Sequence, residues 1–100
     1  MTKKEQMAVF GYLTNEMKKT LFSKGDDYAN EDRLSNFKLA GAISGGNAYT
    51  NCLNMISTKV ARLGNLLNKD GDPNNESIDD SVLDLANYAV LLYMIINENK

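Results

Sequence analysis

Two stretches of the chain repeat apolar residues at alternating intervals of three and four, and this spacing constrains the fold more than any other feature. In the stretch 47–68 the repeated residues are Leu53, Ile56, Val60, Leu63 and Leu67. In the last quarter of the chain they are Ile78, Val82, Leu85, Ala89, Leu92 and Ile96. Residues three and four apart lie on one face of an α-helix. We therefore expect two long helices, joined by the turn 69–75 into an antiparallel hairpin.

Two further helices are expected before the hairpin. The first runs from about residue 4 to 22, with Phe10, Leu13, Met17 and Leu21 on its inner face. Residues 23–25 should end it, with Gly25 as a left-handed cap. The second begins near Asp32 and is capped by Asn30 or Glu31. The side chains expected to face the core are those of Leu34, Phe37, Leu39 and Ile43. The glycine-containing break 44–47 then leads into the hairpin, so residues 1–100 are predicted to form one all-α domain of about four helices.

The end of the last expected helix is apolar on more than one face. Between its repeated residues stand Val90, Leu91, Tyr93, Met94 and Ile95. A helix that is apolar all round requires burial all round. A chain of 100 residues has little core of its own to provide that burial. We therefore predict a homo-oligomer in which a second copy covers the additional face.

Composition excludes several classes of function. The formal charge is −2, without the basic stripe that binding to a long nucleic acid needs. The longest apolar run, 89–96, is too short to span a bilayer, so no membrane role is expected. Cys52 is the only cysteine, which rules out an intrachain disulfide and favours a cytoplasmic location. There is no histidine, so imidazole catalysis and histidine-bound zinc are impossible.

Acidic residues follow one stripe of the last expected helix. Glu76, Asp80 and Asp84 are four residues apart, and Asn87 is three further on. Like charges at this spacing repel, and a cation lying opposite would offset that repulsion. Carboxylates are among the ligands that Mg²⁺ prefers. The alternative is structural, because Glu76 and Asp80 also suit a helix N-terminus, where Ser77 and Asp80 would form a capping box. The sequence thus predicts a possible Mg²⁺ site formed by Glu76, Asp80 and Asp84.

Basic residues are expected opposite this stripe. Lys59 and Arg62 lie three apart on the preceding helix and can pair with Asp84 and Asp80 across the hairpin. Such pairs would form a salt-bridge ladder between the two helices. Alternatively, the same cations bind the phosphate groups of a ligand, for which the planar fork of Arg62 is well suited.

The junction between the first two helices offers further ligand-binding groups. Tyr28 can stack on a base, and Lys24, Arg33 or Lys38 can hold a phosphate. A single tyrosine in such a loop more often packs against the core. We nevertheless predict a ligand-binding set, which comprises Lys24, Tyr28, Arg33, Lys38, Lys59, Arg62 and Asn87.

Several of these segments together resemble the nucleotide modification associated domain 1 family of phages and bacteria. The segments are 24–28 (KGDDY), 32–38 (DRLSNFK), 59–63 (KVARL), 76–80 (ESIDD) and 84–88 (DLANY). The resemblance implies a role in nucleotide metabolism inside a bacterial host cell. The acidic last helix is also similar to that of MazG-like all-α pyrophosphatases, which hydrolyse nucleoside triphosphates with Mg²⁺. Those enzymes carry further carboxylates on the preceding helix, where this chain has Lys59 and Arg62.

Three functions follow from these patterns. The first is a phage-type nucleotide-binding protein whose oligomer holds a phosphate-bearing ligand, linear or cyclic, and could sequester a nucleotide signal of host defence. The second is a Mg²⁺-dependent pyrophosphohydrolase of the MazG-like kind, with Asp26, Asp27 or Asp32 assisting the acidic helix. The third is a structural helical oligomer whose charged face is a salt-bridge network. The missing carboxylate cluster on the preceding helix, where Lys59 and Arg62 stand, and the apolar last helix favour the first.

Overall fold

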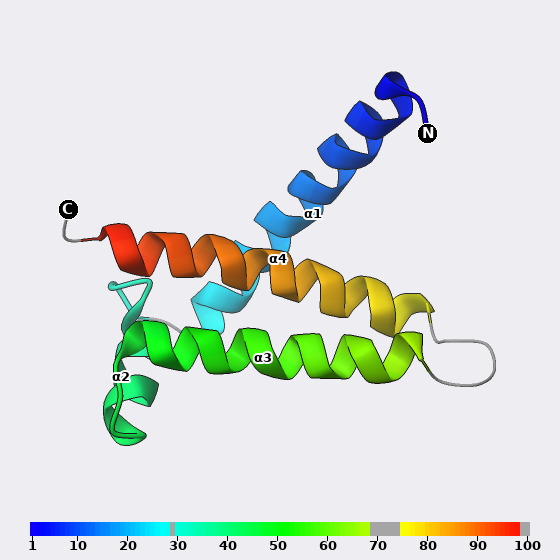
Figure 1. Cartoon of the computed structure of the whole chain (residues 1–100). Helices are drawn as coiled ribbons and strands as arrows, with labels where there is room; N and C mark the ends of the chain where they lie inside the picture. The colour runs from blue at the N-terminus through cyan, green and yellow to red at the C-terminus, as the bar shows by residue number, and fades with distance from the viewer. Residues whose placement is uncertain (29, 69–74, 99–100) are drawn as a thin grey trace.

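The computed structural model of the chain describes residues 1–28, 30–68 and 75–98, apart from the side chains of residues 28 and 75–77. These residues form four helices and no strand: α1 (Lys3–Tyr28), α2 (Ser35–Ile43), α3 (Ala48–Leu67) and α4 (Asn75–Asn97). The predicted all-α fold is therefore confirmed. Helices α3 and α4 form the antiparallel hairpin, α1 crosses α4, and α2 packs on α3 at one end of the hairpin (Figure 1). None of the described helices is long and apolar enough to cross a membrane.

Helix α3 has the boundaries that its sequence predicts, because side chains cap its start. The Asn47 side chain accepts a hydrogen bond from the Thr50 backbone nitrogen at 3.0 Å, and the Thr50 hydroxyl accepts one from the Asn47 nitrogen at 2.9 Å. This reciprocal pair satisfies two donors at the N-terminus of the helix. Further along, Cys52 is buried against α4, where its thiol donates to the Tyr88 carbonyl oxygen at 3.4 Å.

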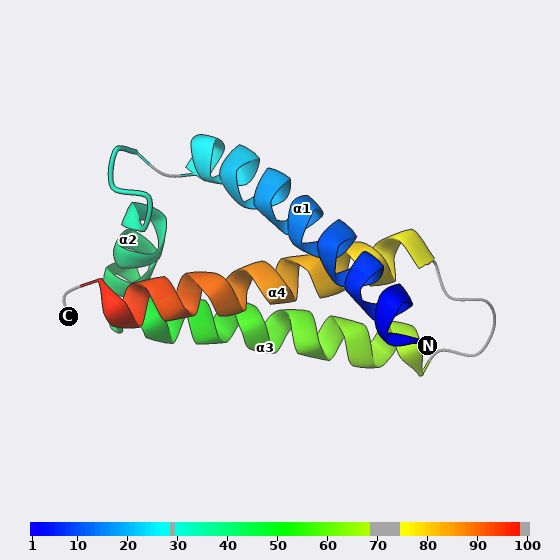
Figure 2. The same cartoon turned by 90° about the horizontal axis from the view of Figure 1, so that it is seen from above.

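The predicted end of the first helix is wrong, because α1 continues through residues 23–25 to Tyr28 and Gly25 lies inside it. No proline interrupts this segment, and Lys24 is held against α4 by an ion pair with Asp84. At the other end, Phe10 is exposed instead of facing inward, as are all of the first twelve residues. This half of α1 stands clear of the hairpin (Figures 1 and 2).

Helix α2 also starts later than expected, at Ser35 instead of Asp32. The Asn30 side chain accepts from the Asp32 nitrogen at 2.8 Å, and the Asp32 carboxylate accepts from the Leu34 nitrogen at 3.0 Å. These bonds form a turn in place of a helix cap. Leu34 and Phe37 are buried as predicted, but Leu39 and Ile43 are exposed. The inward face of this short helix follows the spacing 34, 37, 41, which leaves Leu39 and Ile43 outside.

The hairpin seam does not form as one stripe. The predicted seam residues that are half-buried between α3 and α4 are Ile56, Leu63, Ile78, Leu85 and Leu92. The remaining ones are exposed, namely Leu53, Val60, Leu67, Val82, Ala89 and Ile96. The packed face of α3 is turned toward Cys52, Lys59 and Leu66, which leaves one edge of the predicted stripe outside.

Candidate functional site

Residues from three helices enclose a hollow of about 390 Å³, which we call the polar pocket. Its lining consists of Thr20 and Lys24 of α1, Lys59 and Arg62 of α3, and Asp80, Ser81, Leu83 and Asp84 of α4. Charged residues that are far apart in the sequence thus meet where α1 crosses the hairpin. All five charged residues of this pocket were predicted from the sequence as binding or metal-ligating residues.

Asp84 lies at the centre of the polar pocket and bonds to two lysines. Lys24 Nζ is 2.8 Å from Asp84 Oδ1, and Lys59 Nζ is 3.1 Å from Asp84 Oδ2. The predicted pairing of Lys59 with Asp84 is therefore confirmed. Burial raises the pKa of Asp84, but the hydrogen bonds from Lys24 and Lys59 outweigh it and hold that pKa below its ordinary value. The carboxylate is consequently charged at neutral pH.

Arg62 and Asp80 line the same pocket without pairing with each other. Within the described chain, no ion pair joins them, although the sequence predicted one. Both side chains are exposed, so the guanidinium donors of Arg62 remain available to a ligand. Three cationic side chains face two carboxylates in this pocket, which gives it a net charge of +1. Such a pocket favours an anion over a cation.

A second cavity, of about 380 Å³, adjoins the first, and we call it the apolar pocket. Its apolar lining includes Phe22, Leu34, Phe37, Tyr88, Leu91 and Met94, and its amides are Asn36, Asn51 and Asn87. The rings of Phe37 and Tyr88 meet edge to face, with centroids 6.4 Å apart. Thr20, Lys24 and Asp84 line both pockets. One site therefore has a charged part and an apolar part side by side.

Asn87, predicted to contact a ligand, lies in the wall of the apolar pocket and is only 6% exposed. Its Nδ2 donates to the Met17 carbonyl oxygen of α1 at 3.1 Å, which fixes the orientation of the amide. Its Oδ1 has no hydrogen-bond partner among the described atoms. A buried acceptor left without a partner costs about 1–3 kcal/mol. The oxygen is shielded from solvent, so the predicted ligand contact of Asn87 stays untested.

Arg33 forms another part of the wall of the apolar pocket. Its guanidinium bonds to the Asp26 carboxylate at 2.9 Å and to the Phe22 carbonyl oxygen at 3.3 Å. The guanidinium lies directly against Gly25, where any Cβ atom would collide with it. Gly25 thus makes room for Arg33 within α1. The sequence predicted Gly25 to be a helix cap instead.

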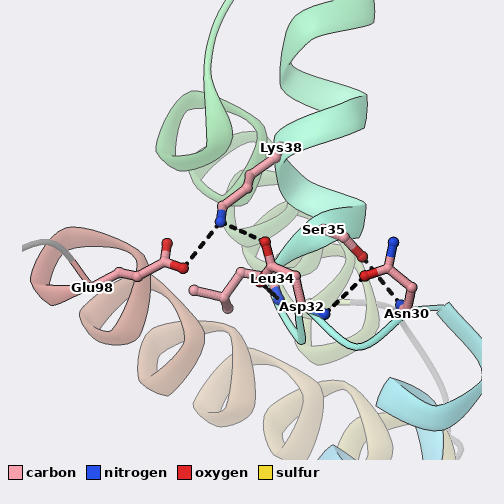
Figure 3. A network of polar contacts seen from close by, with 6 residues as sticks. All are labelled: Asn30, Asp32, Leu34, Ser35, Lys38 and Glu98. Carbon is pink, nitrogen blue, oxygen red and sulfur yellow. Dashed lines mark hydrogen bonds and ion pairs between the residues drawn. The ribbon is translucent and has the colours of Figure 1, made fainter.

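Lys38 lies away from both pockets, in a polar network at the N-terminal end of α2 (Figure 3). Its Nζ is 2.6 Å from Asp32 Oδ2 and 3.0 Å from Glu98 Oε1. These bonds raise the pKa of Lys38, while its hydrogen bond lowers the pKa of Asp32. The network ties the loop before α2 to the end of α4, and the predicted phosphate contact of Lys38 stays untested.

The predicted Mg²⁺ site is only partly described. The side chains of Glu76 and Tyr28 lie outside the described residues, and so does the predicted capping box at Ser77. Among the side chains that are described, no group of three or more cysteine, aspartate or glutamate residues could hold a metal ion. Both oxygens of Asp84 already bond to lysines, so the described donor set suits an anion better than a bare cation.

No family model, curated protein or solved structure matches the chain. The resemblance to the nucleotide modification associated domain 1 family therefore stays a prediction. The functional argument depends on the two pockets alone. Sequence patterns identified their charged residues but not the contribution of Phe22, Asn36 or Asn51, because four helices contribute to the apolar pocket and no local motif marks such a meeting point.

Proposed function

We propose that this chain binds a phosphate-bearing nucleotide, with the phosphate in the polar pocket and the base in the apolar pocket. The observation that carries the proposal is the shared wall: Thr20, Lys24 and Asp84 line both cavities. A nucleotide likewise joins an anionic end to a flat, largely apolar end. Both volumes are within the range of known small-molecule sites, about 300–1,000 Å³.

The polar pocket supplies the groups that recognise phosphate. Arg62 offers several N–H donors in a rigid plane, and it is not bound by any carboxylate of the described chain. Lys24 and Lys59 flank Asp84 and add two further positive charges. An incoming phosphate would compete with Asp84 for the lysines, so Arg62 is expected to make the largest single contribution to phosphate affinity.

The apolar pocket supplies the groups that recognise a base. The ring faces near Phe37 and Tyr88 and the apolar side chains around them favour a flat heterocycle. Asn36 and Asn51 supply amide groups for the edge of a base, whereas Asn87 Oδ1 is shielded from solvent within the pocket wall. Such binding requires neither a general base nor a metal. In a phage protein, as the family resemblance implies, that forms the homo-oligomer expected from the apolar last helix, such binding would sequester the nucleotide.

Thermal unfolding with and without ligand tests the proposal. We would measure the melting temperature with adenosine, AMP, ATP and 3′,5′-cyclic AMP, each in EDTA. Because a ligand that binds only the folded state stabilises it, at least one of the phosphate-bearing compounds should raise the melting temperature more than adenosine does. Arg62→Ala should lower the affinity for that ligand at least tenfold, since removal of one phosphate contact costs about 1.5–3 kcal/mol. Without ligand, its melting temperature should stay within about 2 °C of the wild-type value.

Lys18→Ala is the matched control, because Lys18 is exposed on α1 and lines neither pocket. It removes one positive charge from the chain without touching the site. Equal loss of affinity in both variants would mean that only the overall charge attracts the nucleotide. If none of these compounds, nor their guanine, cytosine and uracil equivalents, shifts the melting temperature, the proposal is wrong.

A Mg²⁺-dependent pyrophosphohydrolase is the second candidate, because Asp80 lines the polar pocket and accepts no ion pair from the described chain. A nucleotide that brings Mg²⁺ with its phosphates would meet this carboxylate. The same titrations, repeated with Mg²⁺ and followed by chromatography of the recovered ligand, separate the two candidates. Cleavage that needs Mg²⁺ and disappears in Asp80→Asn supports the enzyme, whereas an intact ligand supports the binding protein.

A further inference from the structure

The exposed half of the hairpin seam forms a continuous apolar surface, which we call the open seam. It consists of Leu53, Val60 and Leu67 of α3 and Val82, Ala89 and Ile96 of α4. On each helix these residues are seven apart, the repeat by which paired helices pack along their length. Val60 is 52% exposed and Leu67 64%. The open seam thus has the pattern of a helix-packing interface without a helix to cover it.

The open seam lies on the face of the hairpin opposite the pockets. Val82 and Ala89 are each two residues, or about 200° of helical rotation, from the pocket residues Asp84 and Asn87. On α3, Leu53 and Val60 have the same relation to Met55 and Arg62, which also line the pockets. Helix α1 packs on α4 from the pocket side, as the hydrogen bond from Asn87 to Met17 shows.

Charge is segregated between the two faces. The charged residues of α3 are Lys59 and Arg62, and both line the polar pocket. Between residues 82 and 97 of α4 the single charged residue is Asp84, which also lines it. Asp79, three residues before Val82, is exposed at one end of the open seam, which otherwise carries no charge to attract an oppositely charged partner. An uncharged surface with a repeat of seven is instead complementary to a copy of itself.

The chain exposes more surface than a compact monomer of its mass. Its accessible surface is 7370 Å², whereas about 5,700 Å² is expected for a folded monomer of 11.1 kDa. The excess is roughly 1,700 Å². A permanent homodimer covers about 1,000–2,500 Å² on each partner. The surplus, to which the exposed first twelve residues of the chain also contribute, is of the size that docking of a second copy would bury.

We propose that a second copy of this chain docks on the open seam with its own open seam, so that the two hairpins form a four-helix bundle. In this arrangement both pairs of pockets lie on the outside of the bundle and stay accessible. The proposal concerns the opposite face of the hairpin and does not depend on nucleotide binding. It specifies which surface mediates the association that the apolar last helix predicts.

Molar mass in solution tests the proposal. Light scattering after size-exclusion chromatography should give the wild type at least twice the 11.1 kDa of one chain. Val60→Lys and Ala89→Lys each place a charge in the open seam and should reduce the mass to that of one chain. Leu39→Lys is the matched control, because Leu39 is an equally exposed apolar residue on α2, and it should leave the mass unchanged.

Circular dichroism of each variant establishes whether its helices are retained. Should a lysine variant lose its helical signal, Val60→Ser, which adds no charge, should still weaken the association at least tenfold. A wild type with the mass of one chain at about 100 µM would overturn the proposal. So would an assembly that survives both lysine substitutions in the open seam but is abolished by Tyr12→Lys in the exposed half of α1, because that arm would then be the interface.

Discussion

At the scale of single residues, Asp84 joins three helices through its two oxygens. The Asp84 side chain is 18% exposed. Of its two partners, the Lys59 side chain is 19% exposed and the Lys24 side chain 53%. An ion pair shielded from water is worth more than an exposed one. The Lys59 pair thus stabilises the hairpin from within, and the Lys24 pair fixes where α1 crosses it.

Replacing Asp84 should consequently cost stability in a pH-dependent way. Asp84→Asn should lower the free energy of unfolding by about 1–3 kcal/mol at pH 7, because Lys59 loses a charged hydrogen-bond partner. The pKa of Asp84 is lowered on folding, so its contribution is present above the unfolded pKa of about 3.9 and is lost as the pH falls through the folded value.

Urea unfolding at pH 7 and at pH 3 measures this difference. The gap between wild type and Asp84→Asn should narrow markedly at the lower pH. Asp79→Asn is the control, because Asp79 is an exposed residue of the same helix and its effect should stay within about 0.5 kcal/mol. A gap that is the same at both pH values would show that the lysine pairs are not its source.

At the scale of the elements, Gly45 sets the turn between α2 and α3. Its φ is +82°, a backbone conformation that side chains with a Cβ rarely adopt. Ser44 is the C-cap of α2 and Asn47 the N-cap of α3, so only Gly45 and Gly46 lie between the two caps where the chain changes direction. The predicted break at 44–47 is thereby confirmed, and position 45 is the one whose backbone conformation requires glycine.

Gly45→Ala should therefore lower the free energy of unfolding by about 1–2 kcal/mol. Gly45→Asn is the graded control, since asparagine tolerates positive φ better than alanine and should cost less. An added Cβ at Gly45 meets no atom within 4 Å, so neither substitution introduces a clash. Chemical denaturation of both variants provides the measurement. Equal stability of wild type and Gly45→Ala would contradict the left-handed conformation.

At the scale of the whole molecule, the chain is more extended than a compact domain of its length. Its radius of gyration is 15.4 Å, compared with about 13 Å for a compact chain of this length. Among the described residues, the buried apolar side chains are Leu34, Phe37 and Cys52, and of these only Cys52 is fully buried. A core of this size offsets little of the conformational entropy lost on folding. Burial against a second copy would supply what the single chain lacks.

The melting temperature should accordingly depend on protein concentration. If the folded state is stabilised by association, raising the concentration from about 1 to 100 µM should raise the melting temperature by several degrees. Val60→Lys should melt at a lower temperature than the wild type and show no such dependence. Calorimetry or circular dichroism over that range measures both. A wild-type melting temperature that is independent of concentration would contradict association through the open seam.

The sequence by itself determined the helical class, the hairpin, and the charged residues of the site. Helical spacing and capping are local, so the boundaries of α3 and the pairing of Lys59 with Asp84 could be predicted from residue intervals. The sequence also determined the breadth of the apolar stripe on both long helices. The starting points of α1 and α4 were predicted to within two residues for the same reason.

Only the tertiary structure decided how those residues are used. It divided the seam into a packed half and an open half, because the packed face of each helix is turned toward one side of the stripe. It placed Lys38 in the network with Asp32 and Glu98 and carried α1 past Gly25, because contacts with residues distant in sequence outweigh the local preference to stop. It also set the polar and apolar pockets side by side. That adjacency depends on where four helices meet, and residue spacing within any one of them cannot specify it.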